Sequence, residues 1–386
     1  MAVDPNTKQK FSPILGLPVD DEPLAVVSDA APGLADSSAG PELTVIIPAR
    51  NEERNLPVCL ASLLDQDSEL FKLGLDWELL VVDDDSTDST RSIAVTAAAQ
   101  HPGMTVLEAP PLELRATQRA FTGKTNACWA AAQKARGRWL LFTDADTLHE
   151  PGDLVRALHE AKKHEAALLS YSPRQIVHGF WQRALMPLVF SELASVYPLS
   201  QVNDPAQRIA AANGQFLMVE REAYFAVGGH RAVGRSVLED VDLACNIKHS
   251  KRGLRFRYAP DALSTRMYRG LSDMVEGWTK NLALLFPHAL WLAGWRLIDI
   301  ALLLLPLLII LLPHLLLWQK VTILLFWART LLRYFSRVAR SNFGFVNCAL
   351  SVFALPLFIV LLVRSWMKHR VFHQVAWKGR EYRTGR

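Results

Sequence analysis

The sequence lacks several features that would assign a protein class at once. Its cysteines are few and scattered with no C-x-x-C pair, which argues against a disulfide framework and a cysteine zinc site and fits a reducing compartment. No G-x-G-x-x-G follows the first expected strand, so a dinucleotide site is not expected. The N-terminus has no basic segment leading into an apolar run, which argues against a secretory signal. A net charge of +4 is too small to imply nucleic-acid binding.

Apolar residues, in contrast, are abundant, at 50% of the chain with a mean hydropathy of +0.12. The excess gathers after about residue 281, and 386 residues leave room for roughly two folded units. Residues 1–41 are rich in proline and are expected to be a disordered tail. We expect an α/β domain over 42–280, a membrane region with interfacial and transmembrane helices over 281–366, and a basic tail over 367–386.

Apolar, β-branched runs alternate with helical patterns over the first hundred residues of the α/β region. This alternation predicts a mostly parallel, doubly wound sheet. Asn51 is a candidate cap for a helix that runs through Leu64, and Ser86 or Thr87 for the next helix, with Asp88 in its first turn. The expected strands are 43–48, 77–82, 104–107 and 140–142, and a further helix is expected over 123–135.

Two carboxylates follow the expected strand 140–142. Asp144 and Asp146 are spaced i, i+2, and a turn there would let both reach one point beyond the strand. Ligands of open α/β sheets bind at the carboxyl ends of strands, and hard divalent cations take carboxylate oxygens. A solvated turn is the commoner explanation of a bare D-x-D, so the interpretation as a metal site depends on the other motifs around it.

Other candidate groups lie at the neighbouring strand and at the helix 123–135. Asp83 and Asp84 end the second expected strand, where carboxylates can accept hydrogen bonds from a ribose or a base, or else cap the next helix. Lys124 follows a glycine at the start of its helix, a position that suits a phosphate, although a surface lysine is the commoner explanation.

The ordered motifs together resemble the family 2 glycosyltransferases of the GT-A fold. They are "TVIIPARNEERNL", "LLVVDDDSTDST", "GKTNACWAA", "WLLFTDADT" and "VLEDVDLA", followed by an apolar C-terminal region and a closing "WKGREY". The chain looks most similar to membrane-associated bacterial members that glycosylate carotenoid- or hopanoid-type lipids. The resemblance covers roughly residues 43–386.

The resemblance implies a donor site and a catalytic base. Asp83, Asp84, Lys124, Asp144, Pro48 and Glu52 would bind a nucleotide-sugar donor, most simply a UDP-sugar. Asp144 and Asp146 would bind Mg²⁺ or Mn²⁺, which neutralises the leaving diphosphate. Asp240 would take the acceptor proton, giving single displacement with inversion. Taken alone, Glu239-Asp240 also fits dipole stabilisation of a helix start.

One departure from the related synthases concerns Trp278. It stands where chain-building members carry a Q-x-x-R-W box, but the residues here are Glu276-Gly277-Trp278-Thr279. This disfavours the alternative of a polysaccharide synthase. A second alternative, a catalytically inactive membrane scaffold, is disfavoured by the intact Asp144, Asp146 and Asp240.

The region after the D-x-D motif leaves two choices open. Residues 180–202, interrupted by Pro187 and Pro198, are either core or the lining of a lipid acceptor tunnel. His230 is either a structural turn residue or a group that approaches the acceptor.

The C-terminal third predicts a multi-pass protein of the inner membrane with a cytosolic catalytic domain and a membrane-lipid acceptor. Charge-poor runs over 300–319 and 341–363 have the length of spans, and 281–295 fits an interfacial helix. Residues 320–340 are an amphipathic interfacial helix or a third span. The arginines on one face of that segment are Arg329, Arg333, Arg337 and Arg340. Two crossings alone would place them outside, against the positive-inside rule.

Overall fold

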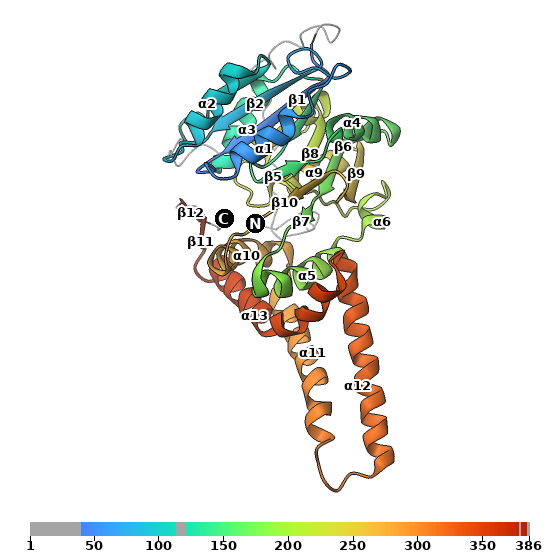
Figure 1. Cartoon of the computed structure of the whole chain (residues 1–386). Coiled ribbons are helices and arrows are strands. Elements are labelled where there is room, and N and C mark those ends of the chain that lie inside the picture. Colours follow the sequence, from blue (N-terminus) through green and yellow to red (C-terminus); the bar gives the residue numbers. More distant parts are fainter. Residues whose placement is uncertain (1–39, 113–120, 378–379, 384–386) are drawn as a thin grey trace, which may run out of the picture. The chain divides into compact units, whose positions relative to one another are not determined.

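The computed structural model describes residues 40–112, 121–377 and 380–383, with the side chains given up to residue 373. The expected tail at 1–41 therefore lies almost wholly outside the described residues, as does part of the tail at 367–386. The chain forms two compact units. Of the described residues, an α/β unit contains those up to Ile176 together with Leu199–Met267, and a helical unit contains Val177–Pro198 with those from Tyr268 onward. The labels of both units are given in Figure 1.

The α/β unit is built on a seven-stranded sheet of order β3-β2-β1-β4-β8-β6-β9. β1, β2, β3 and β4 run parallel, and β8 pairs antiparallel with β4 and with β6. The predicted doubly wound, mostly parallel sheet is confirmed. The strands are β1 (Leu43–Ala49), β2 (Trp77–Asp83), β3 (Met104–Glu108), β4 (Trp139–Phe142), β6 (Ala166–Ser172), β8 (Leu217–Glu220) and β9 (Gly253–Tyr258).

A smaller sheet of order β5-β10-β7 follows the D-x-D turn. It comprises β5 (Thr147–His149), β7 (Arg174–Gln175) and β10 (Leu263–Thr265). The helices of the unit are α1 (Leu56–Leu64), α2 (Thr90–Gln100), α3 (Gly123–Lys134), α4 (Asp153–Lys163), α6 (Leu199–Val202), α7 (Arg221–Ala226), α8 (Gly229–Ala232) and α9 (Glu239–His249).

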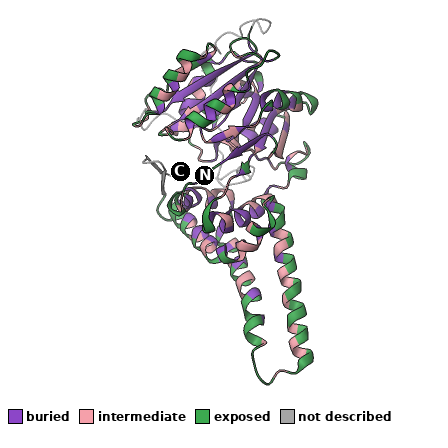
Figure 2. Ribbon diagram, in the orientation of Figure 1, coloured by how far each residue is buried: buried purple, intermediate pink, exposed green. Residues whose placement is uncertain are grey.

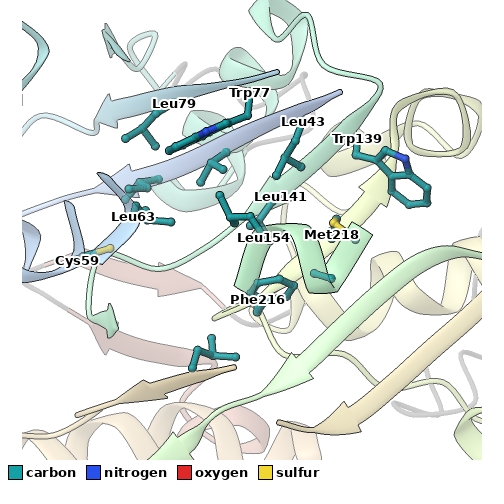
Figure 3. Close-up of a cluster of buried hydrophobic side chains, with 14 of the residues drawn as sticks. Leu43, Cys59, Leu63, Trp77, Leu79, Trp139, Leu141, Leu154, Phe216 and Met218 are labelled. Atoms are coloured by element: carbon teal, nitrogen blue, oxygen red, sulfur yellow. The ribbon is translucent and has the colours of Figure 1, made fainter. Parts of the chain in front are cut away.

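Both faces of the large sheet are buried, which is why its strands are apolar on both sides. Leu43, Val45 and Ile47 of β1 belong to a cluster with Cys59 and Leu63 of α1 and with α4 (Figure 3). The alternate residue Ile46 is also fully buried but lies outside that cluster, and α3 packs on β1 and β2. Continuous apolar strands are typical of a sheet covered by helices on both faces.

The loops after β1 and β2 are joined by hydrogen bonds, and they differ from the expected caps. Asn51 has a positive φ of 53° and its side chain accepts from Thr87 N at 2.9 Å, so it joins the two loops. Asn55 is the residue before α1, and Ser89 the residue before α2. Both expected helix starts were placed too early, because the polar side chains that suggested caps bind the opposite loop.

The helical unit contains α5 (Gly179–Val196), α10 (Leu271–Leu285), α11 (Ala289–Ile309), α12 (Leu317–Val338), η1 (Ala339–Ser341) and α13 (Phe345–Arg370), followed by the β11 (Gln374–Trp377) and β12 (Arg380–Arg383) hairpin. α13 packs on α5, α10 and α11, and α11 packs on α12. α11 and α12 extend as a largely exposed hairpin (Figure 2).

The expected boundaries in this unit need correction. The charge-poor run 300–319 is not one span, because the chain leaves α11 at Ile309 and begins α12 at Leu317. The expected interfacial helix 281–295 is likewise divided between the end of α10 and the start of α11. Residues 320–340 form one amphipathic helix as expected, apart from the short η1 at its end. α11 and α13 are each long and apolar enough to cross a membrane by length and composition.

An ion-pair network joins three helices of this unit. Arg296 Nη1 of α11 lies 3.3 Å from Glu192 Oε1 of α5 and 2.7 Å from Asp299 Oδ2. Arg337 Nη2 of α12 lies 2.7 Å from the same Asp299 oxygen. Arg337 is therefore turned inward, whereas Arg329, Arg333 and Arg340 are exposed.

Residues 180–202 contain a buried, core-forming part around residues 184–189, whereas Phe180, Trp181 and Leu199 are exposed. Pro187 does not interrupt the segment, because α5 continues through it as one helix of 18 residues. Leu185, Met186 and Leu188 are buried. Trp278 of α10 is buried against the rings of Tyr268 and Phe190, so it also belongs to the core of the unit.

Candidate active site

The D-x-D turn lies where the sequence placed it, directly after β4. Asp144 and Asp146 flank the buried Ala145 between β4 and β5. Two threonine hydroxyls hold the backbone of the turn. Thr147 Oγ1 donates to Asp144 O at 2.7 Å, and Thr265 Oγ1 of β10 donates to Asp146 O at 3.1 Å. The apolar strand thus ends in a fixed loop that carries two carboxylates at the edge of the sheet.

Lys124 connects this turn to α9. Its Nζ lies 2.8 Å from Asp144 Oδ1 and 2.9 Å from Glu239 Oε1. α3 begins here because Thr122 and Thr125 form a reciprocal capping box, which fixes the position of the lysine one residue inside the helix. Burial alone would lower the pKa of Lys124, but Asp144 and Glu239 outweigh it and hold this pKa well above its usual value. Lys124 is therefore a charged ammonium inside the site.

Asp240 lies beside this ion pair. Gly214 N donates to Asp240 Oδ2 at 2.7 Å, and Val241 N donates to Asp240 Oδ1 at 2.8 Å. A Cβ on Gly214 would lie 2.8 Å from Lys124 Nζ and 3.5 Å from Asp240 Oδ2. Three acidic groups from distant parts of the sequence, Asp144, Glu239 and Asp240, therefore meet around one lysine.

The environment of Asp240 suits proton transfer. Burial and the charge of Glu239 raise the pKa of Asp240 to about 7, against the opposing effects of Lys124 and of the two backbone N–H donors. A carboxylate with a pKa near neutrality is a better general base than an ordinary aspartate, because it holds a transferred proton more strongly.

The residues predicted to bind the donor nucleotide also gather at the ends of β1 and β2. Asp83 and Asp84 are both buried, and Asp83 Oδ1 accepts from Ser86 N. Pro48 lies opposite Val82 in the β1–β2 register. Glu52 Oε2 accepts from Asn55 Nδ2 at 2.6 Å, and Glu52 N donates to Thr90 Oγ1 at 2.7 Å. Their roles in donor binding stay predictions.

The chemistry of the D-x-D turn fits a hard divalent cation. Asp144 already pairs with a cation, the Lys124 ammonium, and carboxylate oxygens are the ligands that Mg²⁺ and Mn²⁺ favour. Within residues 40–112, 121–377 and 380–383, no three His, Cys, Asp or Glu side chains form a metal site of their own. A cation held by Asp144 and Asp146 would complete its coordination with water and the oxygens of a bound diphosphate.

One outcome decides between two options and another was missed by sequence reasoning. His230 is buried, and its Nδ1 lies 2.9 Å from the hydroxyl of Tyr224, so it has the structural role that was one of the two options. Glu239 was treated only as part of a helix start, yet it holds Lys124 in the site. The sequence offered no signal for this pairing, since the two residues are far apart along the chain.

Comparison with known proteins identifies the family and agrees with the fold. The family model described as Glycosyl transferase family 2 matches residues 44–241. The chain is 26% identical over 357 residues to the 4,4'-diaponeurosporenoate glycosyltransferase of Staphylococcus aureus (strain MRSA252), with 88% of each chain covered. It is also similar to the structure of a mannosyltransferase from Pyrobaculum calidifontis in complex with GDP-Man and Mn²⁺. That likeness has 18% identity and a TM-score of 0.50, and covers 86% of this chain and 88% of the other.

The family match spans just over half of the chain and includes every site residue discussed above, from Pro48 to Asp240. The structural likeness agrees in fold over nearly the whole chain. With its mostly parallel α/β sheet of the GT-A fold and this family match, the chain belongs to glycosyl transferase family 2.

Proposed function

We propose that this protein is a membrane-bound, metal-dependent glycosyltransferase that moves a sugar from a nucleotide-diphosphate donor to a membrane lipid with inversion. The observation that carries the proposal is the meeting of Asp144, Lys124, Glu239 and Asp240 at one edge of the sheet. This edge contains a carboxylate turn suited to a cation and a separate carboxylate suited to a proton.

On the donor side, Asp83 and Asp84 would hold the nucleoside, with Pro48 and Glu52 completing that end of the site. Asp144 and Asp146 would hold Mg²⁺ or Mn²⁺, which supplies charge neutralisation of the leaving diphosphate. Lys124, already charged, would add a second positive group near the phosphates. The Pyrobaculum mannosyltransferase, with the same fold, was solved with a sugar nucleotide and Mn²⁺.

On the acceptor side, Asp240 would remove the proton of the attacking hydroxyl as the new glycosidic bond forms. For an acceptor carboxylate that is already ionised, the same residue would position the oxygen instead. A single base facing the sugar from the side opposite the diphosphate gives one displacement, and therefore inversion.

A lipid acceptor is supported by the relative and by the exposed surface of the helical unit. The name of the Staphylococcus enzyme gives 4,4'-diaponeurosporenoate as what it glycosylates. In this chain the α11–α12 hairpin exposes apolar side chains along its length and at its turn, where Leu311 is 75% and Leu317 is 80% exposed. Apolar surface of this extent is stable in contact with lipid rather than with water.

The hairpin also suggests an arrangement that would avoid the topological conflict that the sequence left open. α11 and α12 run out and back, so the base of each helix lies on the same side, together with Arg333 and Arg340. α13 packs along α5 and α10 with nine of its 26 residues buried, which fits an interfacial helix of the unit. We propose that the hairpin inserts into the inner membrane from the cytosol and that the arginines stay at the cytosolic face.

The test of this function uses membranes that contain the full chain. They are incubated with UDP-, GDP- and dTDP-sugars labelled in the sugar, with Mn²⁺, and the lipid extract is analysed for label. Transfer of label by the wild type, and its loss in the Asp240→Asn variant, is the expected result. Label that appears in a water-soluble polymer would support a polysaccharide synthase, and no label with any donor would overturn the proposal.

A further inference from the structure

A buried polar network lies beneath the D-x-D turn and has no part in the chemistry described above. It consists of Thr143 at the end of β4, Thr147 and His149 of β5, and Asp153 at the first position of α4. None of the four is more than 3% exposed. Four polar side chains in the interior represent a considerable desolvation cost, so their arrangement calls for an explanation.

The network runs from Asp153 to the backbone of the turn. His149 Nδ1 lies 2.8 Å from Asp153 Oδ2, and His149 Nε2 lies 3.1 Å from Thr143 Oγ1 and 3.3 Å from Thr147 Oγ1. Beyond the histidine, Thr147 Oγ1 donates to Asp144 O at 2.7 Å, and Thr143 Oγ1 donates to Gln215 O at 2.8 Å.

Counting protons indicates the direction of these bonds. Each threonine hydroxyl has one proton, the two backbone carbonyls can only accept, and the two threonine oxygens lie 2.9 Å apart. With both hydroxyl protons directed at Asp144 O and Gln215 O, the threonine oxygens offer only lone pairs, and a proton on His149 Nε2 is the donor that they share. The bond of 2.8 Å between His149 Nδ1 and Asp153 Oδ2 then takes its proton from a doubly protonated ring or from the Asp153 carboxyl, whose pKa burial raises.

The two carbonyls belong to the two halves of the site. Asp144 is the first residue of the D-x-D turn, whereas Gln215 follows Gly214, whose N–H binds Asp240. The second carbonyl of the turn, Asp146 O, accepts from Thr265, and Gln215 Nε2 donates to that same threonine at 3.2 Å. One buried histidine thus contacts, through two hydroxyls, both the carboxylate turn and the loop that binds the base.

We propose that His149, oriented by Asp153, is a positioning residue for the transfer reaction. Its Nε2–H orients the two threonine hydroxyls, so that Thr143 donates to Gln215 O and Thr147 donates to Asp144 O. These bonds fix the position of the cation-binding turn relative to the loop that binds Asp240. The inference rests on the proposed donor site at Asp144 and Asp146.

The experiment compares His149→Gln with His149→Asn in the full-length protein. A glutamine amide reaches about as far as Nε2 and can still donate to the threonines, whereas an asparagine amide reaches about as far as Nδ1 and cannot. The control is Thr44→Val, which breaks a different buried network, with Glu78 and Gly137, at the beginning of β1. The measurements are melting temperature, affinity for UDP, GDP and dTDP with Mn²⁺, and steady-state transfer.

We expect His149→Asn to weaken Mn²⁺-dependent nucleotide binding and to reduce turnover about tenfold or more, as for other residues that orient metal ligands. His149→Gln should recover most of both. Thr44→Val should lower the melting temperature by a similar amount and leave affinity and turnover unchanged. Equal binding and turnover in His149→Asn and wild type would overturn the inference, as would losses in Thr44→Val equal to those in His149→Asn.

A spectroscopic measurement separates this inference from the donor site itself. In protein labelled with ¹⁵N-histidine, the ring signals missing from His149→Gln belong to His149, and their shifts report which nitrogen is protonated. Protonated Nε2 is expected, and a bare Nε2 would overturn the inference even if nucleotide binding fails. A wild type that binds none of the three nucleotides would count against the proposed donor site. The protonation of His149 Nε2, measured by the ¹⁵N shifts, would then be the test of the proposed role of His149.

Discussion

The backbone N–H of Gly214 donates a hydrogen bond of 2.7 Å to Asp240 Oδ2, so a glycine in the loop before β8 holds the proposed catalytic base. The second oxygen of Asp240 accepts from Val241 N. Both bonds orient the carboxylate at the start of α9, where a longer side chain at position 214 would compete with Lys124 for space. The following experiments examine what this arrangement does.

Replacing Asp240 by asparagine should abolish transfer while donor binding survives. The amide keeps the shape of the side chain but cannot take a proton, and loss of a general base typically costs about 10²- to 10⁴-fold in rate. Single-turnover transfer and nucleotide affinity, measured on the same preparation, separate the two effects. Undiminished turnover in this variant would remove Asp240 from the catalytic role.

The same variant should be more stable than the wild type at alkaline pH. In the unfolded chain Asp240 ionises with its ordinary pKa of 3.8, whereas in the folded protein burial and Glu239 raise this pKa to about 7. Ionisation therefore opposes folding, with no effect below pH 4, an increasing effect between pH 4 and 7, and the full effect above 7. Asp240→Asn removes this cost, so its melting temperature should exceed that of the wild type at pH 8 and equal it near pH 4. Equal melting temperatures at pH 8 would contradict the raised pKa.

Gly214→Ala should weaken the donor site without unfolding the protein. The added Cβ would lie 2.8 Å from Lys124 Nζ, the end of a flexible side chain, so the ammonium can move but loses its contacts with Asp144 and Glu239. We expect affinity for the nucleotide to fall several-fold and turnover to fall with it, because the ammonium is displaced while Asp240 Oδ2, at 3.5 Å from the added Cβ, stays in ordinary contact. Gly294→Ala, where a Cβ meets nothing within 4 Å, is the matched control.

Asp146→Ala should make nucleotide binding insensitive to Mn²⁺. Removing one of two carboxylates leaves Asp144 alone, and a single carboxylate paired with Lys124 binds a divalent cation poorly. Isothermal titration of the nucleotide with and without Mn²⁺ measures the difference, with Asp65→Ala, an exposed aspartate at the end of α1, as control. Unchanged affinity in Asp146→Ala with Mn²⁺ would argue against a cation at this turn.

Much of the α/β unit was predictable because its signals are local. The strands β1, β2 and β4 are apolar runs with polar residues at or just after their ends, and a parallel sheet brings the ends of such strands to one edge. The family resemblance, rather than a local signal, implied that Asp240 joins Asp144 there, and Gly214, whose N–H binds Asp240, lies next to Lys124, the partner of Asp144. The pairing of Lys124 with Glu239 and the network behind His149 were not predictable, because they join side chains whose contacts depend on the packing of β5, α3 and α9.

The boundaries in the helical unit failed for a different reason. Hydropathy counts apolar residues along the chain, and the turn between α11 and α12 is itself apolar, so it gives no signal of an interruption. The early helix starts at Asn51 and Ser86 have a different cause, because the polar side chains there bind across two loops rather than within one. A turn is visible in sequence only when its residues differ from those on either side.

The apolar turn leads to a prediction about the membrane. The variant replaces two leucines by arginine: Leu311, in this turn, and Leu317, at the start of α12. It should move the protein from the membrane fraction to the soluble fraction. A charged side chain in the hydrocarbon region raises the free energy of insertion by about 3 kcal/mol. Two such changes should therefore outweigh the free energy that favours insertion of the hairpin. Leu70→Arg, at a leucine of the α/β unit that is 95% exposed, is the matched control and should leave the distribution unchanged.

Nucleotide binding by the double variant should persist, because the α/β unit contains every residue proposed for the donor site. If the double variant stays with the membrane as firmly as the wild type, the α11–α12 hairpin is not the element that inserts.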